Sequence, residues 1–379
     1  MVGVRGFASA PPPRFRSGTD MLVGGAEVAA EALARHLAKR GHEVTVFTRG
    51  GYEETVGPGL RTEPAPFIPG RRTEALSHSV MATLKLSSRR YDVAHFHAVG
   101  PGSCAVLTRL RGLRSVVTVQ GIDWERGKWV GWEQHALRAL GIAGIRAADQ
   151  VTAVAPSLVK PLEALGARNV TCVPNGYVPL GPGNSHTLAG LGLTSRRYHL
   201  MMTRLVPEKN VGDVIRAYGA APRVWPMVIA GGGSHSGEYV ESLRHLIEQT
   251  PGVRFVGPVH GPEKATLITE AGSFLNASSV EGLSLALLEA LGAGVPVGIS
   301  RISGNLDIFT LVGRADVIEP LSFSVGDTIA IARVLGELES LTPAGRATWS
   351  RIAPLIEQRF SWDRIAVAME SVYRRLPIA

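Results

Sequence analysis

Residues 278–292 read Ser-Ser-Val-Glu-Gly-Leu-Ser-Leu-Ala-Leu-Leu-Glu-Ala-Leu-Gly, and this stretch decides the fold together with its flanks. An apolar strand is expected before it at residues 273–277, and another after it at residues 295–299. The leucine-rich part, residues 285–291, is expected to form a helix. A strand, a helix and a strand in succession predict two parallel strands of one sheet, and hence an α/β fold.

The same alternation of apolar runs and helical patterns extends over the rest of the chain. A long helix is expected to start near Gly25 and to end at Gly41, a residue type suited to helix ends. The other expected strands are residues 1–4, 42–47, 93–97, 114–120, 150–154, 170–173, 199–203, 224–230 and 253–256. A Gly/Pro-rich stretch at residues 179–185 separates the two halves. We therefore predict two Rossmann-like domains, residues 1–180 and 181–360, that face each other across an interdomain cleft.

The composition excludes several classes of protein. A chain of 379 residues with 45% hydrophobic and 19% charged residues is long enough for two domains and too apolar to be disordered. With neither a membrane-spanning apolar run nor a signal-peptide pattern, it is expected to be cytoplasmic. Cys104 and Cys172 form no CxxC pair and are expected to be buried thiols. The net charge of +8 comes mostly from arginine, so it is weak evidence for a nucleic-acid partner.

Two carboxylates in the opening stretch are the strongest candidates for a binding site. Glu281 is expected in the loop before the helix, where the free backbone N–H groups of Gly282, Leu283 and Ser284 would form an anion site suited to a diphosphate. Glu289 lies inside the helix in an apolar run, so its carboxylate needs hydroxyl donors such as those of a ribose. The alternative is that Glu281 is a solvated loop residue and Glu289 binds a neighbouring backbone group.

An ordered set of motifs connects the chain to a known family. The Glu-x₇-Glu spacing, with the following Ala-Leu-Gly-Ala-Gly-Val-Pro-Val, resembles the donor site of retaining GT-B glycosyltransferases of glycosyltransferase family 4. Further matching segments are Gly24-Gly25-Ala26-Glu27, Asp92-Val93-Ala94-His95-Phe96-His97, Val173-Pro174-Asn175-Gly176, Arg204-Leu205-Val206-Pro207-Glu208-Lys209-Asn210 and Phe360-Ser361-Trp362. The resemblance covers nearly the whole chain. It implies an acceptor-binding domain, a nucleotide-sugar-binding domain and a final helix, residues 361–379, that crosses back to the first domain.

The resemblance also implies roles for residues of the second domain. Arg204 and Lys209 would grip the donor pyrophosphate and neutralise the charge that grows as it leaves. Glu281 would contact sugar hydroxyls and Glu289 the ribose. The remaining donor-binding candidates are Gly231, Gly232 and Val256, with Gly24 and Gly25 in the first domain. No metal is expected, because the two cations neutralise the diphosphate and no Asp-x-Asp motif is present.

The first domain contains the candidates for chemistry at the acceptor. His97 ends an expected strand and is either a catalytic group or a core histidine; the pattern does not separate it from His95. Where family members often have a His-Gly pair, this chain has Gln120 before its glycine, and glutamine cannot carry a proton in catalysis. We therefore expect Gln120 to position a sugar or the acceptor. The following aromatic and charged segment adds the candidate acceptor-binding residues Asp123, Trp124 and Arg126, although an ordinary amphipathic segment has the same composition.

The function implied is retaining transfer of a hexose-type sugar from a nucleoside-diphosphate sugar to a hydroxyl of a saccharide, glycolipid or metabolite. A sugar-nucleotide epimerase of the same fold is the main alternative. A basic nucleic-acid-binding protein lacks a recognised module, and a dinucleotide-dependent dehydrogenase lacks Gly-x-Gly-x-x-Gly after the first strand. The basic segments Arg14-Phe15-Arg16 and Arg71-Arg72 allow two interpretations: peripheral docking on an anionic membrane at its inner face, or solvated loops.

Overall fold

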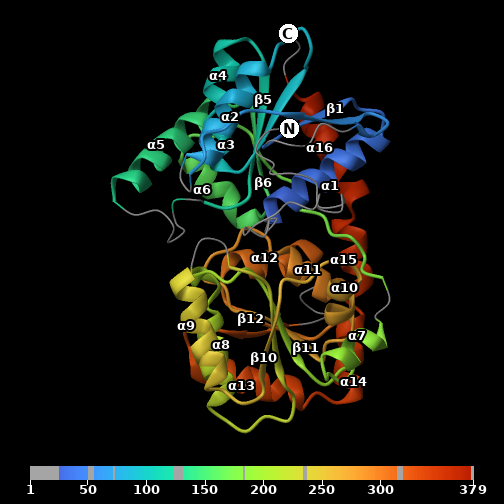
Figure 1. Cartoon of the computed structure of the whole chain (residues 1–379). Coiled ribbons are helices and arrows are strands. Elements are labelled where there is room, and N and C mark those ends of the chain that lie inside the picture. Colours follow the sequence, from blue (N-terminus) through green and yellow to red (C-terminus); the bar gives the residue numbers. More distant parts are fainter. Residues whose placement is uncertain are drawn as a thin grey trace. The chain divides into compact units, whose positions relative to one another are not determined.

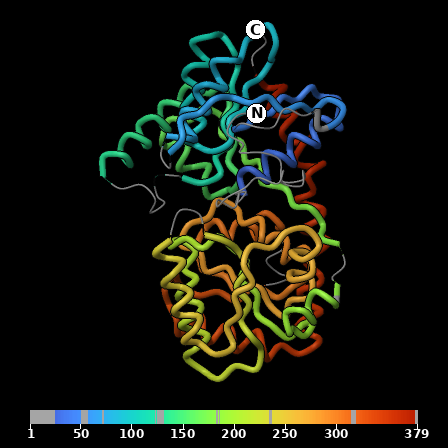
Figure 2. The backbone as a smooth tube through the Cα atoms, in the orientation of Figure 1, coloured from blue at the N-terminus to red at the C-terminus, as the bar shows by residue number. Residues whose placement is uncertain are grey.

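The computed structural model describes residues 25–49, 55–70, 73–122, 124, 131–181, 184–233, 237–313 and 319–376 (Figures 1 and 2). Its contacts divide the chain into two compact units. The first unit consists of Met1–Gly176 with Trp362–Ala379, and the second consists of Tyr177–Ser361. The change of unit after Gly176 lies four residues before the predicted boundary at residue 180. Both units are α/β, as predicted.

The main sheet of the first unit has four parallel strands in the order β4-β5-β6-β7. These strands are β4 (Val93–His97), β5 (Arg114–Val119), β6 (Gln150–Ala153) and β7 (Val170–Cys172). Their side chains are almost all buried in β4, β5 and β6, as expected for a parallel sheet that is covered on both faces. The strand expected at residues 1–4 lies outside the described residues.

A second, smaller sheet in this unit was predicted only in part. Its strands are β1 (Val44–Thr48), β2 (Thr55–Gly57) and β3 (Leu60–Pro64), in the order β1-β3-β2. β1 pairs with β3 in parallel, whereas β2 pairs with β3 antiparallel. The sequence Gly57-Pro58-Gly59 makes this hairpin, with Gly59 at φ +73°. β2 was not predicted, and its antiparallel pairing adds to the parallel pairing that the sequence predicts.

Seven α-helices are described in the first unit. They are α1 (Gly25–Lys39), α2 (Glu74–Lys85), α3 (Val99–Gly102), α4 (Ala105–Leu110), α5 (Trp132–Ala147), α6 (Val159–Ala164) and α16 (Trp362–Arg374). The chain's last described helix, α16, lies beside the first, α1 (Figure 1). Trp362, Ile365 and Met369 pack with Leu33 and Leu37 in one buried cluster. The amphipathic pattern of α16 is thus used to cover the first unit.

The second unit contains a six-stranded sheet in the order β10-β9-β8-β11-β12-β13, with parallel pairing throughout. The strands are β8 (His199–Met202), β9 (Met227–Ala230), β10 (Val253–Gly257), β11 (Ser273–Asn276), β12 (Val297–Ser300) and β13 (Leu321–Phe323). The helices are α7 (Ser185–Gly190), α8 (Val211–Gly219), α9 (Gly237–Glu248), α10 (Gly261–Thr269), α11 (Leu285–Gly292), α12 (Ser303–Val312), α13 (Thr328–Glu339), α14 (Pro343–Ser350) and α15 (Ala353–Phe360). Because the strands are parallel, the loops after β8, β9, β10, β11 and β12 all leave the same edge of the sheet.

Candidate active site

Two loops of the second unit are tied together at the carboxyl ends of neighbouring strands. β8 and β11 pair side by side, so the loop after each begins next to the other. The loop after β8 contains a 3₁₀ turn, Pro207–Lys209, and then Asn210 in the left-handed conformation at φ +51°. The Asn210 side-chain amide donates to the carbonyl of Ala277 at 2.8 Å, and the N–H of Ser279 donates to the carbonyl of Glu208 at 2.9 Å. These bonds hold the side chain of Lys209 against the loop after β11.

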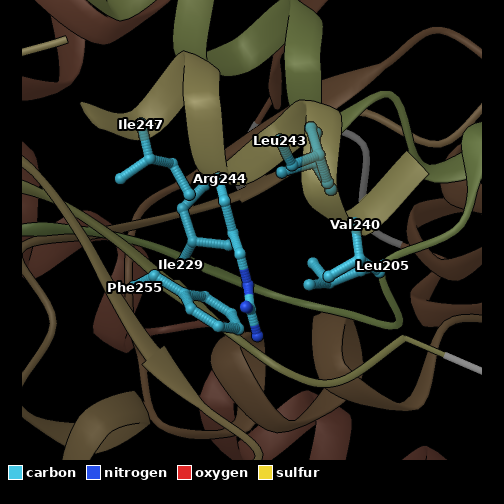
Figure 3. A pocket seen from close by; sticks show the side chains of 8 residues that line it. Leu205, Ile229, Val240, Leu243, Arg244, Ile247 and Phe255 are labelled. Carbon is cyan, nitrogen blue, oxygen red and sulfur yellow. The ribbon is translucent and has the colours of Figure 1, made fainter. Parts of the chain in front are cut away.

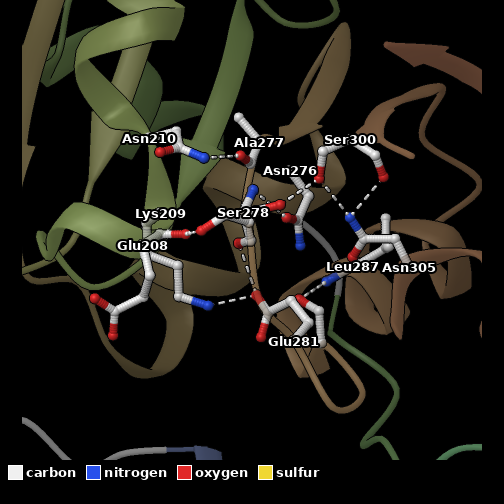
Figure 4. A network of polar contacts seen from close by, with 12 residues as sticks. Glu208, Lys209, Asn210, Asn276, Ala277, Ser278, Glu281, Leu287, Ser300 and Asn305 are labelled. Atoms are coloured by element: carbon white, nitrogen blue, oxygen red, sulfur yellow. Dashed lines mark hydrogen bonds and ion pairs between the residues drawn. The ribbon is translucent and has the colours of Figure 1, made fainter. Parts of the chain in front are cut away.

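Lys209 and Glu281 form an ion pair in this place (Figure 4). The Lys209 ammonium donates to Oε1 of Glu281, and the Ser278 hydroxyl donates to the same oxygen at 2.8 Å. Only 10% of the lysine side chain and 15% of the glutamate side chain are exposed. The two residues predicted to bind different parts of a donor, the pyrophosphate and the sugar, therefore contact each other.

A buried network next to this pair fixes the loop that contains Glu281. The Ser300 hydroxyl donates to the carbonyl of Ser278 at 2.6 Å, and the Asn305 amide donates to Oγ of Ser300 at 3.0 Å (Figure 4). The N–H of Ser278 is accepted by Oδ1 of Asn276 at 3.1 Å. Gly304 has no room for a side chain, because a Cβ there would lie 2.4 Å from the carbonyl oxygen of Glu281. α12 thus packs against this loop and holds it in place.

The start of α11 has the unused donors that the sequence predicts. Within the described chain, the backbone N–H groups of Gly282, Leu283 and Ser284 donate no hydrogen bond. The Ser284 hydroxyl accepts from the N–H of Leu287 at 3.3 Å and so caps the helix. The backbone N–H groups of residues 282–284 and the positive end of the helix dipole together can bind an anion.

Arg204 lies on the same loop as Lys209. Its side chain is half-buried and makes no hydrogen bond or ion pair with any described residue. A partly buried guanidinium without a partner is suited to bind a ligand phosphate in a bidentate manner. Considering the described residues, this loop contains one cation that pairs with a carboxylate and one that does not, a difference that the residue pattern alone could not indicate.

The glycines after β9 fit closely against the loop after β8. Gly231 has φ +138°, and a Cβ there would lie 1.8 Å from the carbonyl oxygen of Thr203. The carbonyl of Gly232 accepts from the N–H of Leu205 at 2.9 Å. Gly231 is thus required for the contact between these two loops, independently of any role in binding a ligand. Val256 lies partly exposed near the end of β10.

Glu289 has a protein partner that the sequence analysis missed. Nζ of Lys264, on α10, donates to Oε1 of Glu289, on α11, at 2.5 Å. Burial raises the pKa of Glu289, and the nearby Lys264 ammonium lowers it in part. The sequence did indicate that Glu289 needs a partner, because its carboxylate lies in an apolar run. It did not indicate Lys264 as that partner, because helix α10 had not been predicted.

In the first unit, the structure distinguishes the two histidines of β4. His95 contacts two hydroxyls, with Nδ1 2.7 Å from Tyr373 Oη and Nε2 2.6 Å from Thr118 Oγ1. His97 is 4% exposed, and neither of its ring nitrogens has a hydrogen-bond partner among the described residues. The two rings stack with centroids 4.3 Å apart. Burial lowers the pKa of His97 to about 3, so its ring is neutral at physiological pH.

The remaining candidates of the first unit are paired, buried or outside the described residues. The amides of Gln120 and Asn175 donate to each other, at 3.1 and 2.8 Å. Trp124 is only 7% exposed, and its carbonyl accepts from Gln134 on α5 at 2.7 Å, so its contacts are those of a core residue. Gly25 is the exposed first residue of α1. Gly24, Asp123 and Arg126 lie outside the described residues.

An apolar hollow beneath α9 has none of the candidate residues in its lining (Figure 3). It is lined by Leu205, Val211, Ile229, Val240, Leu243, Arg244, Ile247 and Phe255. Its lining offers a single charged group and little polar surface, so it is unsuited to a diphosphate. Among the residues that the structure describes, no cluster of three or more His, Cys, Asp or Glu side chains could hold a metal ion, and no helix has the length and hydropathy to cross a membrane.

Two family models together match most of the chain. The sequence model of Glycosyltransferase Family 4 matches residues 23–179, and that of Glycosyl transferases group 1 matches residues 191–320. A glycogen synthase of Mycobacterium tuberculosis is 26% identical over 93% of this chain and 91% of its own. A D-inositol 3-phosphate glycosyltransferase of Saccharomonospora viridis is 28% identical over 93% and 89%, respectively.

Solved structures share the fold at lower identity. Sucrose-phosphate synthase of Thermosynechococcus elongatus superposes with a TM-score of 0.79 at 19% identity, over 93% of this chain and 94% of that one. HepE of Anabaena, solved in complex with UDP and glucose, superposes with a TM-score of 0.75 at 16% identity, over 93% and 96%.

Proposed function

Because the chain belongs to the group 1 glycosyltransferases of the GT-B fold, we propose that it transfers a hexose-type sugar from a nucleoside-diphosphate sugar to an acceptor hydroxyl with retention of configuration. One observation carries the proposal. The paired Lys209 and Glu281 lie on the loops at the ends of β8 and β11, and the unused N–H groups of residues 282–284 follow directly after Glu281. Such a site combines cation, carboxylate and helix terminus, which are the groups that a diphosphate-linked sugar requires.

In this proposal the diphosphate binds the N–H groups at the start of α11 and the guanidinium of Arg204. Lys209 supplies the second positive charge, with its ammonium held in place by Glu281. Glu281 in turn uses its carboxylate to accept hydrogen bonds from sugar hydroxyls. Negative charge grows on the phosphate as it leaves, so these fixed cations and dipoles stabilise the transition state more than the bound donor.

The transfer step needs no nucleophile from the protein. The bond from the anomeric carbon to the phosphate oxygen breaks, and the bond from that carbon to the acceptor oxygen forms on the same face. The acceptor proton passes to the departing phosphate oxygen, so atoms and charge balance. His97, which is neutral, would donate or accept a hydrogen bond to a substrate hydroxyl and would not carry the proton.

Uridine nucleotides are the first donors to test. Three solved structures of the same fold were determined with UDP, UDP-glucose or UDP-2-fluoro glucose. The names of the relatives include a glycogen synthase and inositol-phosphate glycosyltransferases, so the acceptor class stays broad: a saccharide, a glycolipid or a small metabolite. The basic segments proposed to dock on an anionic membrane lie outside the described residues.

Two measurements test the proposal. A thermal-shift screen of UDP, ADP, GDP, dTDP and their glucose or mannose derivatives should yield stabilisation by one nucleotide series. Proton NMR of the product of that donor should then show the anomeric configuration of the donor. Absence of stabilisation by every nucleotide contradicts the donor site, and an inverted anomeric bond contradicts the retaining mechanism. Consumption of the donor without any acceptor would favour an epimerase.

A further inference from the structure

The second carboxylate of the Glu-x₇-Glu motif, Glu289, forms an ion pair with Lys264. Glu289 is on α11, the helix whose first N–H groups form the proposed diphosphate site, and 13% of its side chain is exposed. Lys264 reaches it from α10, with 31% of the lysine side chain exposed. Lysine is rare in this protein, with six in the whole sequence, and two of them pair with the two carboxylates of the Glu-x₇-Glu motif.

The geometry leaves one carboxylate oxygen of Glu289 for a ligand. Lys264 Nζ contacts Oε1, whereas Oε2 makes no hydrogen bond within the described residues. Helices α10 and α15 and strands β11 and β12 pack against α11. Among the charged side chains on the described parts of these elements, only Lys264 forms a hydrogen bond or an ion pair with the Glu289 carboxylate. The state of this carboxyl is thus controlled from α10.

We propose that Lys264 is a specificity-determining residue of the donor site: it holds Glu289 as a carboxylate, and so enables Glu289 to accept hydrogen bonds from the ribose hydroxyls of a nucleoside diphosphate. This inference rests on the proposed function. An ionised carboxylate accepts hydrogen bonds at both oxygens, whereas a protonated one donates from one of them and is the weaker acceptor. Charge-assisted bonds of this kind favour a ribonucleotide over its dideoxy analogue by about tenfold to a hundredfold.

Burial of Glu289 favours its protonated form, so its ionisation depends on Lys264. Burial raises the pKa of Glu289, and the Lys264 ammonium counteracts part of that rise. If Lys264 is replaced by a neutral residue, the carboxyl takes up a proton at a higher pH than in the wild type. Recognition of the ribose should then be lost at low and neutral pH and should return as the pH rises.

The test is the ratio of two dissociation constants. Isothermal titration calorimetry with UDP and with 2′,3′-dideoxyuridine 5′-diphosphate, at pH 6, 7.5 and 9, isolates the ribose because both ligands have the same base and diphosphate. The wild type should prefer UDP by about tenfold or more at all three values. Lys264→Met should reduce the preference to about threefold or less at pH 6 and 7.5 and should recover part of it at pH 9. Lys264→Arg should keep it.

Three further variants make the result decisive. Glu289→Gln should lose the preference at every pH, and Lys264→Met should cause no further loss in its background. Lys85→Met removes an exposed lysine that pairs with Glu63 on the first unit, and it should leave the ratio unchanged. Thermal unfolding of each variant shows whether it is folded, and Glu289→Gln, which keeps the size of the side chain, serves if Lys264→Met does not fold.

Two outcomes overturn the inference and differ in what else they affect. If the wild type binds UDP and Lys264→Met keeps the wild-type ratio at pH 6, or if the wild type has no preference, the inference alone is wrong. If the wild type binds none of UDP, ADP, GDP and dTDP, the donor site itself is wrong and the inference falls with it. Should another of these nucleotides bind in place of UDP, its own dideoxy analogue gives the same ratio.

Discussion

The two units present different chemistry at the ends of their parallel strands. In the second unit the loops after β8 and β11 are ionic: Lys209 is paired with Glu281, and Arg204 has no partner among the described residues. In the first unit the end of β4 is neutral, because burial lowers the pKa of His97 to about 3 and keeps the neighbouring His95 uncharged as well. Stabilisation of a leaving diphosphate is therefore expected from the second unit, and neutral hydrogen bonds to hydroxyls from the first.

The contrast between the two units requires that the charged residues of the second unit are needed for sugar transfer. Arg204→Ala, Lys209→Ala and Glu281→Ala should each lower kcat/KM by about 10²-fold or more, because each removes a group that is fixed where charge develops. Initial rates of sugar transfer measure this. Arg216→Ala, which removes an exposed arginine of α8, is the matched control and should keep the wild-type rate. Wild-type rates in all three site variants would contradict the assignment.

A double-mutant cycle on Lys209 and Glu281 tests whether the two residues act together. Lys209→Ala alone leaves a largely buried carboxylate without its cation, and Glu281→Ala alone leaves the ammonium without its anchor. The two substitutions together should therefore cost less than the sum of the single effects on ΔG‡.

A smaller effect is expected from the neutral histidine of the first unit. His97→Phe should lower kcat/KM by about tenfold, the contribution of one hydrogen bond to a substrate hydroxyl, and His97→Gln by less. Because the pKa of His97 is about 3, its ionisation leaves no limb in the pH profile between pH 5 and 9. Rates across that range test both points, with the exposed His135→Gln as control. An acid limb near pH 6 that disappears in His97→Gln would instead make His97 a proton carrier.

Much of the fold could be predicted because buried parallel strands appear in the sequence as short, mainly apolar runs. The expected strands at residues 93–97 and 170–173 match β4 and β7 to within a residue at each end. The hairpin of β2 and β3 was missed, since Arg61 and Glu63 interrupt β3 with charge and its pairing depends on a tight turn. Packing against a neighbour, rather than local pattern, determines such strands.

The residues of the candidate site could be predicted from the sequence, but the contacts between them could not. The spacing of Glu281 and Glu289 singled out both carboxylates, because charge in an apolar helix is costly without a partner. Their partners lie elsewhere in the sequence: Lys209 is 72 residues from Glu281, and Lys264 is 25 residues from Glu289. Only the arrangement of strands and helices brings them together, so pairing of this kind escapes a pattern-based prediction.

The smallest effect concerns an ion pair of the first unit that connects the end of α1 to α16. Arg40, just after α1, donates to both oxygens of Glu370 on α16, with Nε 2.5 Å from Oε1 and Nη2 3.0 Å from Oε2. The hydrogen bond from Arg40 lowers the pKa of Glu370 to about 2, from an ordinary value of 4.5. The carboxylate is therefore favoured in the folded state, and the pair adds stability above about pH 4.5 that is lost as the pH falls towards 2.

Glu370→Gln should accordingly lower the melting temperature at pH 7 by about 2–4 °C, because the partly exposed Arg40 loses the buried carboxylate with which it pairs at the contact between α1 and α16. The difference from the wild type should shrink as the pH is lowered from 5 towards 2, while the transfer rate at pH 7 should stay the same. Differential scanning fluorimetry over that range gives the first result, and Glu337→Gln, which breaks an exposed pair within α13, is the control. A difference in melting temperature that stays constant down to the lowest pH would show that packing, not charge, joins α16 to α1. A loss of transfer activity would show that charge in the first unit is not only structural, and the contrast between the two units would no longer hold.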